Sequence, residues 1–293
     1  MSDTILAIDL GGTRYRAGRA LASNPASIEP VGEWPAPMTR ATFLEMVRNQ
    51  LGELDATRLG IGVPGLATGT TCRWVPNLPY LDGLDLAKAL PGISIGLGND
   101  AQLALLAEVA AGSARGLSDV MLLAIGTGIG SAVMTGGRIV AGSGGGACSF
   151  GWATADLADE GEDRSGWLER HASGRALDAA AEAIGLASGT ALVNAARQGQ
   201  GIAVRALEPP MHALGTALAG AAALLDPEAI IIAGGVAASL DVLEPMILKS
   251  LHRQLPPHLR QIGLRAGEFG PRAGIVGASF AGAGGPAWRN HNG

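Results

Sequence analysis

The stretch Ile5–Gly18, ILAIDLGGTRYRAG, decides how the N-terminal part of this chain folds. An apolar run typical of a buried strand ends in the turn Gly11, Gly12 and Thr13, and a second β-type segment follows, so the stretch predicts a β-hairpin. The turn offers backbone N–H groups and a threonine hydroxyl, which are suited to binding phosphate oxygens. The carboxylate of Asp9 would repel such a phosphate unless a cation lay between them. We therefore expect Asp9 to hold Mg²⁺, through water, beside a phosphate-binding turn.

A partial echo of this stretch lies at Leu122–Met134, LLAIGTGIGSAVM. It again joins an apolar strand to a turn of glycine and threonine, here Gly126, Thr127 and Gly128, and then to a second β-type segment. Taken alone, either turn could be an ordinary hairpin turn without a ligand. The two together favour an internally duplicated chain whose two lobes hold one polyphosphate. Asp9 has no counterpart in the second copy. The two copies therefore differ at the position expected to hold the cation.

Composition narrows the class of protein. The chain has 293 residues, 47% of them hydrophobic, and suits one large α/β domain or two lobes, of which we favour two. Its net charge of -5 provides no basic surface for nucleic acid, so a small molecule is the expected partner. Apolar stretches such as AIIIAGG are far shorter than the roughly 20 residues of a membrane helix, so no membrane partner is expected. With only Cys72 and Cys148 and no recognisable secretory leader, we expect a cytoplasmic protein without a disulfide framework.

The segment Gly96–Gly112, GLGNDAQLALLAEVAAG, predicts a helix that begins at Asn99 and Asp100. Residues of these types at a helix start are often no more than N-caps. A helix N-terminus also stabilises an ionised carboxylate, which makes Asp100 a candidate general base. Asn99 carries both a donor and an acceptor, so it could hold one sugar hydroxyl while its neighbour is deprotonated. The two interpretations are compatible.

Seven motifs, in one order, resemble those of the ROK (repressor, open reading frame, kinase) family of sugar kinases: AIDLGGT, GIGVPG, PNLP, GNDAQLALLAE, IGTGIGSAVMTGGRIVAGSGGGA, LERHASGRAL and IIIAGGV. The resemblance covers nearly the whole chain. It implies an α/β fold of the actin-like ATPase (ribonuclease H-like) type, duplicated and two-lobed, in which ATP and a sugar meet between the lobes. It also implies ATP and Mg²⁺ as cofactors, a sugar as substrate and a possible homodimer.

The resemblance also assigns roles to single positions. Asp100 matches the catalytic base, and Asn99 and Glu169 match residues that bind the sugar. Asn77 in PNLP could line the sugar cleft, although an asparagine between two prolines is more typical of a turn. Two phosphate turns and an adenosine-side turn would bind the nucleotide, and the matching residues are Asp9, Gly11, Gly12, Thr13, Gly126, Thr127, Gly128, Gly234 and Gly235.

The sequence departs from the family pattern in the expected sugar site. Where family members carry Gly-Glu-x-Gly-His, this chain reads CSFGW, with Ser149 in place of a sugar-binding Glu and Trp152 in place of a His that binds sugar and zinc. The loss of a carboxylate and the gain of an aromatic ring predict that glucose is a poor substrate and that a modified hexose, N-acylated or acidic, is a better one. Trp152 could stack on a sugar ring or be buried where the zinc site would lie.

The zinc-binding cysteines of the family are also missing, because the stretch ADLADEGEDRSGW before LERHASG contains none. Cys148 and His171 alone cannot form the four-ligand site of a structural zinc ion, so we predict no zinc. The acidic run DEGED is expected to be a solvated surface loop.

The first lobe is predicted to comprise residues 1–112 and about 273–293, with a helix-like stretch at Ala273–Gly284 folding back onto it. Residues 113–272 would form the second lobe. A Rossmann fold is not expected, because DLGGT leads into a β-type segment and does not open a helix.

The leading functional hypothesis is ATP-dependent phosphorylation of a hydroxyl of a hexose or hexose derivative, with Asp100 as general base. The alternative is a catalytically weak or silent sugar-binding regulatory protein of the same fold. Repressors of the family carry a helix-turn-helix domain ahead of the first phosphate turn, and because Asp9 lies so near the start of the sequence we do not expect one here. The sequence therefore favours the enzyme.

Overall fold

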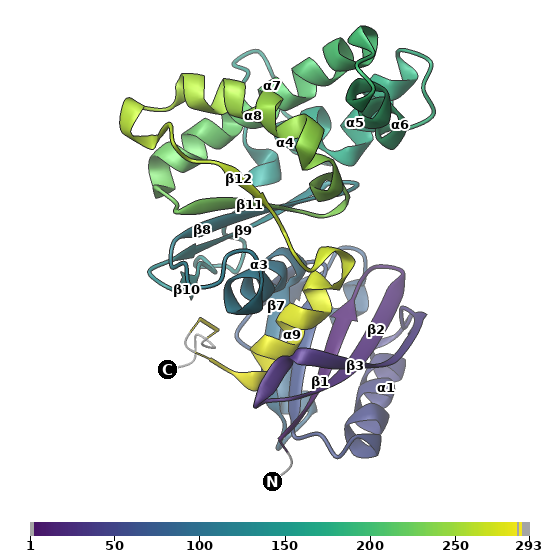
Figure 1. The fold of residues 1–293 in the computed structure, drawn as a ribbon. Coiled ribbons are helices and arrows are strands. Elements are labelled where there is room, and N and C mark those ends of the chain that lie inside the picture. The colour runs from purple at the N-terminus through teal and green to yellow at the C-terminus, as the bar shows by residue number, and fades with distance from the viewer. Residues whose placement is uncertain (1–2, 286, 289–293) are drawn as a thin grey trace. The chain divides into compact units, whose positions relative to one another are not determined.

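The computed structural model describes residues 3–285 and 287–288 of the chain. The N-terminal stretch lies in a five-stranded mixed sheet of strand order β3-β2-β1-β4-β7 (Figure 1). The predicted hairpin is confirmed, because β1 and β2 pair antiparallel and are joined by the glycine turn. β4 and β7 extend the sheet parallel to β1. The strands of this sheet are β1 (Thr4–Leu10), β2 (Arg14–Leu21), β3 (Asn24–Pro35), β4 (Arg58–Val63) and β7 (Ser94–Asn99).

A second five-stranded sheet repeats this arrangement in the order β10-β9-β8-β11-β12. In both sheets the first strand of the copy is central, with its second and third strands on one side and two parallel strands on the other. The internal duplication that the two glycine turns predicted is therefore confirmed. The strands of the second sheet are β8 (Val120–Ile125), β9 (Ile129–Thr135), β10 (Arg138–Ile139), β11 (Ala229–Ala233) and β12 (Leu264–Ala266).

Helices connect and cover the strands. A small hairpin, β5 (Leu66–Thr68) with β6 (Thr71–Trp74), follows β4. None of the described helices is both long and apolar enough to span a membrane. The helices are α1 (Arg40–Glu53), α2 (Leu86–Ala89), α3 (Asp100–Ala111), α4 (Trp167–Ala172), α5 (Gly174–Glu182), α6 (Gly189–Arg197), α7 (Gly201–Leu225), α8 (Leu240–Gln254) and α9 (Ala273–Ala283).

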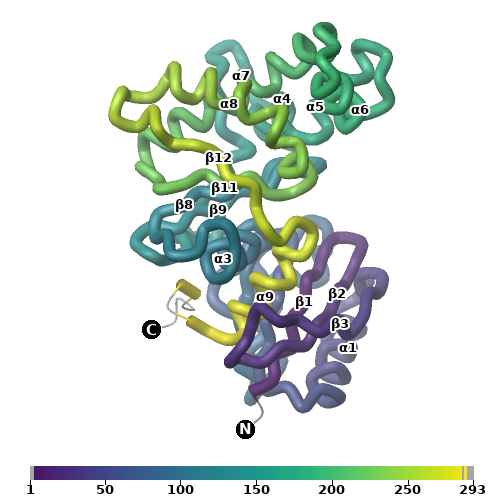
Figure 2. The backbone as a smooth tube through the Cα atoms, viewed as in Figure 1, coloured from purple at the N-terminus to yellow at the C-terminus, as the bar shows by residue number. Residues whose placement is uncertain are grey.

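Glycines allow α9 to lie directly on one face of the first sheet. A Cβ atom at Gly60 would overlap the carbonyl oxygen of Ala278, and one at Gly96 would overlap that of Ala281. Since neither strand position carries a side chain, the helix backbone meets the sheet backbone. Figure 2 shows this end of the chain, in yellow, beside the purple strands from its beginning. The prediction that this stretch folds back onto the first part of the chain is confirmed.

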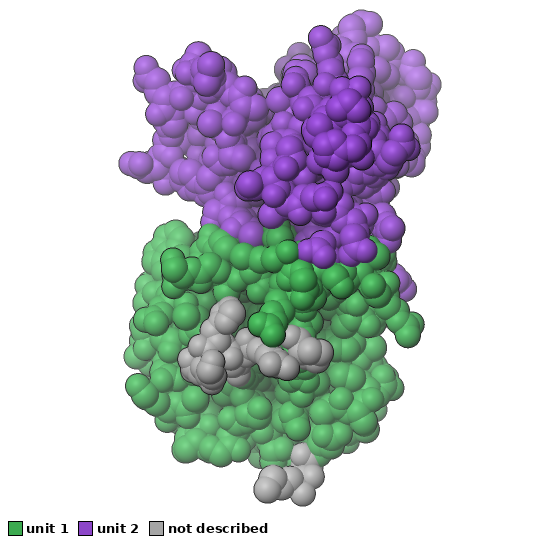
Figure 3. Space-filling view, turned by 90° about the vertical axis from the view of Figure 1, so that its left-hand side faces the viewer, with its two compact units in different colours: residues 1–118, 132–147, 271–293 green, residues 119–131, 148–270 purple. Residues whose placement is uncertain are grey.

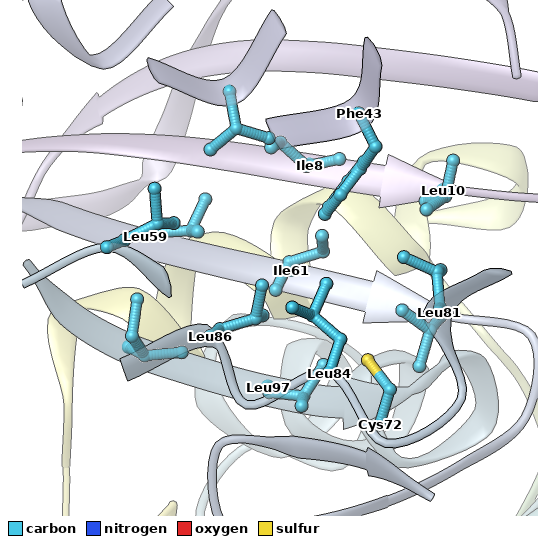
Figure 4. Packing of buried hydrophobic residues seen from close by; sticks show 14 of the residues in the cluster. Ile8, Leu10, Phe43, Leu59, Ile61, Cys72, Leu81, Leu84, Leu86 and Leu97 are labelled. Carbon is cyan, nitrogen blue, oxygen red and sulfur yellow. The ribbon is translucent and has the colours of Figure 1, made fainter. Parts of the chain in front are cut away.

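The opposite face of the first sheet forms an apolar core with α1 and the segment around β6. Ile8, Ile61 and Leu97 point from three strands into this core, where they pack with Phe43 of α1 (Figure 4). Thr39 caps the helix by accepting a hydrogen bond from the N–H of Thr42 at 3.2 Å. Burial of each large apolar side chain contributes about 1.5–3 kcal/mol. This core holds the strands in register and so fixes where their carboxyl ends lie.

The chain divides into two compact units, which Figure 3 shows in different colours. Unit 1 comprises residues 1–118, 132–147 and 271–293, and unit 2 comprises residues 119–131 and 148–270. Of the predicted first lobe, residues 1–2, 286 and 289–293 lie outside the described part of the chain. The predicted lobe boundaries stay a prediction.

Candidate functional site

In unit 1, Asp9 lies next to the carboxyl end of β1, in a row of facing residues that crosses the sheet. Arg16 is its direct partner on β2, and Glu33 is the partner of Arg16 on β3. The Nη1 group of Arg16 lies 3.3 Å from Oδ2 of Asp9, and its Nε lies 3.2 Å from Oε2 of Glu33. On the other side of Asp9 the row continues through Gly62 and Gly98. Charge therefore alternates along the row on one side of Asp9, while on the other side the two glycines make room for the side chains of Leu103 and Trp288.

The surroundings of Asp9 raise the pKa of its carboxyl group. Burial raises its pKa above the ordinary value, Arg16 opposes that rise, and the charge of Asp100 adds to it. The N-terminal turn of α9 lies against this carboxylate, since a Cβ at Gly274 would be 2.9 Å from Oδ1 of Asp9. Oδ1 makes no hydrogen bond to the described residues and is left for another ligand. A carboxylate oxygen of this kind suits Mg²⁺, which prefers oxygen ligands and keeps several waters.

The turn after β1 is closed by one hydrogen bond, from the N–H of Gly11 to the carbonyl of Arg14 at 2.8 Å. Gly12 and Thr13 are exposed at its tip. Asn77 lies against this tip, because a Cβ at Gly12 would be 3.0 Å from the Cβ of Asn77. Asn77 lies in a turn, as the two flanking prolines suggested. This turn packs against Gly12 of the first candidate phosphate-binding turn.

Two side chains hold the segment that carries Asn77. Arg40, the first residue of α1, donates to the carbonyls of Tyr80 and Asp82, at 2.8 Å each. The carboxylate of Asp82 accepts a hydrogen bond from the N–H of Val75 at 2.7 Å. The position of Asn77 thus depends on residues both before and after it in the chain.

Asn99 and Asp100 stand at the junction of β7 and α3. Asn99 is the N-cap, because its Oδ1 accepts a hydrogen bond from the N–H of Gln102 at 2.7 Å, and the Gln102 side chain accepts one in return from the N–H of Asn99. The side-chain nitrogen of Asn99, Nδ2, makes no hydrogen bond in this cap. Asp100 accepts a hydrogen bond from the N–H of Ala101 at 2.8 Å. The N-cap interpretation is therefore correct for Asn99, and it leaves Asp100 directed out of the helix start.

Asp100 is accessible to solvent, yet protein atoms lie close to its carboxyl group and affect its ionisation. Burial raises the pKa of Asp100 above the ordinary value, and the hydrogen bond from Ala101 opposes the rise. A carboxylate with a raised pKa that water and ligands can still reach is suited to accept a proton. Because β1, β4 and β7 are parallel neighbours, Asp9 and Asp100 lie at the same edge of the sheet, about 10 Å apart by strand spacing.

In unit 2, the turn Gly126–Gly128 between β8 and β9 is held by residues from α4 and α5. The N–H of Gly174 donates to the carbonyl of Gly126 at 2.7 Å. Glu169 accepts a hydrogen bond from the N–H of Ile129 at 3.1 Å with one oxygen and pairs with Arg175 at 2.8 Å with the other. The structure thus places Glu169, predicted to contact a sugar, directly against the second turn.

A pocket in the same unit begins at this turn. It has a volume of about 210 Å³ and is open to solvent, and Gly126 and Gly235 are among its lining residues. Gly234 precedes it at the end of β11 with φ of +79° and packs against the carbonyl of Ile125. The predicted adenosine-side turn therefore borders a real pocket. The complete lining is Ile125, Gly126, Gly174, Leu177, Asp178, Gly189, Thr190, Val193, Gly235, Val236, Ser239 and Leu243.

Ser149 and Trp152 belong to a short 3₁₀ segment whose hydrogen bonds connect it to β9. Ser131 donates its hydroxyl to the carbonyl of Cys148 and accepts the N–H of Phe150 at 3.0 Å. Trp152 is exposed, with 53% of the residue accessible to solvent. The alternative in which Trp152 is buried is therefore wrong, because the segment turns its ring outward.

The acidic loop before α4 is mostly exposed, as expected, but one of its carboxylates makes a close ion pair. Asp159 is paired with Arg170 of α4 at 2.5 Å, and Arg170 also donates to the carbonyl of Ser165 at 2.7 Å. The hydrogen bond from Arg170 lowers the pKa of Asp159. Within residues 3–285 and 287–288, no group of three or more His, Cys, Asp or Glu is placed to hold a metal ion.

Sequence reasoning missed several residues that the structure brings to these sites. Arg16 and Arg175 lie beside the two turns, and Asp178 and Thr190 line the pocket. The only available signal for Arg16 was its place in the hairpin register opposite Asp9. Arg175 had no comparable signal, because it lies 48 residues after Thr127, whose carbonyl it contacts.

Comparison with known proteins shows which protein family the chain belongs to. The sequence model of the ROK family matches residues 5–281. The glucokinase of Streptomyces coelicolor is 28% identical, with 94% of this chain and 96% of the relative covered. The N-acetylmannosamine kinase of Shigella flexneri is 29% identical, with 94% and 97% covered. The structure of a ROK family glucokinase from Streptomyces griseus in complex with glucose and AMPPNP is 26% identical, with 94% and 98% covered and a TM-score of 0.73.

These findings define an actin-like ATPase fold of two mixed α/β lobes, each with a five-stranded sheet. The chain belongs to the ROK family, and the glucokinase and the N-acetylmannosamine kinase that match it over 94% of its length are sugar kinases. The fold and the family predicted from the sequence are both confirmed.

Proposed function

We propose that this protein transfers the γ-phosphoryl group of ATP to a hydroxyl of a hexose or hexose derivative, with Asp100 as the general base. The observation that carries the proposal is the position of Asp100. It lies at the start of α3, accessible to ligands, at the same sheet edge as Asp9. In open α/β sheets ligands bind outside the carboxyl ends of the strands. A kinase relative binds the ATP analogue AMPPNP, which supports ATP as the donor.

Unit 1 supplies the groups that act on the acceptor. The carboxylate of Asp100 takes the proton of the hydroxyl as that oxygen attacks the γ-phosphorus, and ADP leaves. The unused amide of Asn99 donates to a neighbouring hydroxyl and orients the sugar. Asn77 adds a further polar contact beside the first turn. Asp9 would hold Mg²⁺ through water, and the cation would supply neutralisation of phosphate charge.

Unit 2 supplies nucleotide contacts. The pocket between the end of β8, α5, α6 and α8 has a mixed polar and apolar lining that suits a nucleoside. Gly235 lines this pocket and Gly234 directly precedes it, and the turn Gly126–Gly128 offers backbone N–H groups to phosphate oxygens. The first turn, Gly11–Thr13, offers the same groups in unit 1.

The acceptor we propose is a hexose modified by an N-acyl or acidic substituent. Ser149 is smaller than a glutamate and carries no charge, so it neither repels an acidic substituent nor fills its space. The exposed ring of Trp152 offers an apolar face on which a sugar can stack. Glu169 would complete the sugar contacts, since each oxygen of a carboxylate accepts more than one hydrogen bond. One relative is an N-acetylmannosamine kinase and another a glucokinase, and both substrate types therefore belong in the test.

Asp100→Asn tests the base. Asparagine keeps the oxygen that accepts from Ala101, so we expect normal folding and ATP binding but turnover at least about 100-fold lower. The matched control is Asp55→Asn, an exposed position with φ of +47°, which asparagine tolerates, and which lies between α1 and the amino end of β4. Unchanged turnover in Asp100→Asn would remove Asp100 from the mechanism.

A sugar screen tests the substrate. ATP consumption is measured with neutral, amino, N-acetylated and acidic hexoses for the wild type and for Ser149→Glu. We expect modified hexoses to be used best by the wild type, with Ser149→Glu shifting the preference towards unmodified sugars. Turnover of glucose above that of every modified sugar would refute the substrate assignment and leave the kinase in place. ATP and sugar binding without any turnover would support the regulatory alternative.

A further inference from the structure

The contacts around the turn Gly126–Gly128 determine which way its peptide groups point. The carbonyl of Gly126 accepts from the N–H of Gly174 at 2.7 Å, and the carbonyl of Thr127 accepts from Nε of Arg175 at 3.2 Å. In a planar trans peptide the C=O and the following N–H point in opposite directions. The N–H groups of Thr127 and Gly128 are therefore turned away from the start of α5.

Arg175 is itself fixed in place. Its Nη2 group donates to Oε1 of Glu169 at 2.8 Å, while Oε2 of Glu169 accepts from Ile129 at the end of the turn. Gly128 leaves room for this arrangement, since a Cβ there would lie 2.6 Å from Oε2 of Glu169. The guanidinium group is thus linked to the turn twice, directly through the carbonyl of Thr127 and indirectly through Glu169.

The guanidinium still has donors to spare. Of its five N–H groups, two are used in these contacts, and Nη1 makes no hydrogen bond to any residue that the structure describes. The Arg175 side chain is 61% exposed, so a ligand can reach it. A rigidly held guanidinium beside outward-facing backbone N–H groups has the chemistry of a phosphate site.

We propose that Arg175 binds a phosphate oxygen of the nucleotide through Nη1 while its Nε holds the carbonyl of Thr127 and so fixes the conformation of the turn. The inference rests on the proposed function, because it assumes that the nucleotide occupies the neighbouring pocket. That pocket begins at Gly126 and Gly174, so a nucleoside bound in it would extend its phosphates along the turn. Glu169 serves this site as the anchor of Arg175.

Titration calorimetry with ATP, ADP and adenosine tests the assignment on the full chain. We expect Arg175→Gln to weaken ATP and ADP binding about 10- to 100-fold, the range of one or more charge-assisted hydrogen bonds, and to leave adenosine affinity within about twofold. Arg175→Lys keeps the charge but not the fork of donors, so its loss should be smaller. Arg205→Gln, an exposed arginine of α7 in the same unit, is the control and should bind all three ligands like the wild type.

Two results would overturn the inference: ATP affinity of Arg175→Gln within about twofold of the wild type, or equal losses for ATP and adenosine, which would show a merely structural role. A wild type that binds neither ATP nor adenosine would instead refute the proposed function as well. Thermal unfolding of each variant, measured beside the titrations, shows whether the proteins compared are folded.

Discussion

Replacing Gly234 by alanine should damage both the fold of unit 2 and the pocket beside this glycine. Gly234 has φ of +79° and ψ of -168°, a backbone region that is essentially restricted to glycine. A Cβ there would also lie 2.5 Å from the carbonyl oxygen of Ile125 and 2.9 Å from its carbonyl carbon. Both atoms belong to the backbone of β8, so no side chain can move aside to relieve the overlap.

The size of the effect follows from these two features. Holding a non-glycine residue in such a region costs about 1–3 kcal/mol. Overpacking against rigid surroundings costs about another 1–3 kcal/mol. We therefore expect Gly234→Ala to lower the free energy of unfolding by about 2–6 kcal/mol. At about 2 °C or more per kcal/mol, the unfolding temperature should fall by at least about 4 °C.

The next residue provides a matched control. Gly235 has no positive φ, and nothing lies within 4 Å of the position of its Cβ. Gly235→Ala should therefore change the free energy of unfolding by no more than about 0.5 kcal/mol. Circular dichroism during heating, with urea unfolding as a second measurement, compares the two variants with the wild type. Equal unfolding temperatures for Gly234→Ala and Gly235→Ala would show that the backbone argument is wrong.

Three further predictions concern the region before α4 and the two cysteines. Arg170 lowers the pKa of Asp159, so the ionised carboxylate stabilises the fold above the ordinary aspartate range and loses that effect as the pH falls through the lowered pKa. Asp159→Asn should thus unfold at a lower temperature than the wild type at pH 7, and the difference should vanish in acid; a difference that persists in acid would contradict this. Burial raises the pKa of the Cys72 thiol to about 12 and leaves it 1% exposed, so a thiol reagent at pH 8 should label Cys148 in the native protein and Cys72 only after unfolding. Rapid labelling of two thiols would argue against it. Elemental analysis should find no stoichiometric zinc, because residues 154–166 contain neither Cys nor His, and one zinc per chain would disprove that reading of the sequence.

Local pattern was sufficient for much of the fold. The hairpin around Gly11 and Gly12 and the start of a helix at Asn99 are set by interactions within a few residues, namely turn conformation and N-capping. Duplication could be predicted for the same reason, since each copy carries its own apolar strand and glycine turn. The strands before the two predicted turns, β1 and β8, are the central strands of two sheets with the same strand order.

The surroundings of the site could not be predicted in this way. Glu169 and Arg175 reach the turn at Gly126–Gly128 from about 40 residues further along the chain, through helix packing that no periodicity records. The outward orientation of Trp152 depends on hydrogen bonds between its segment and β9. The contacts and the exposure of these groups are set by their neighbours in space.

The sequence by itself determined the family, the two glycine turns and the carboxylates Asp9 and Asp100, because these depend on residue type and short spacing. Tertiary structure alone decided what surrounds each carboxylate and each turn. Strand register put Arg16 and Glu33 in line with Asp9, and parallel pairing brought Asp9 and Asp100 to one edge. The physical reason is that pKa, hydrogen bonding and access to a ligand all depend on distances of a few ångströms between residues that are far apart in the chain.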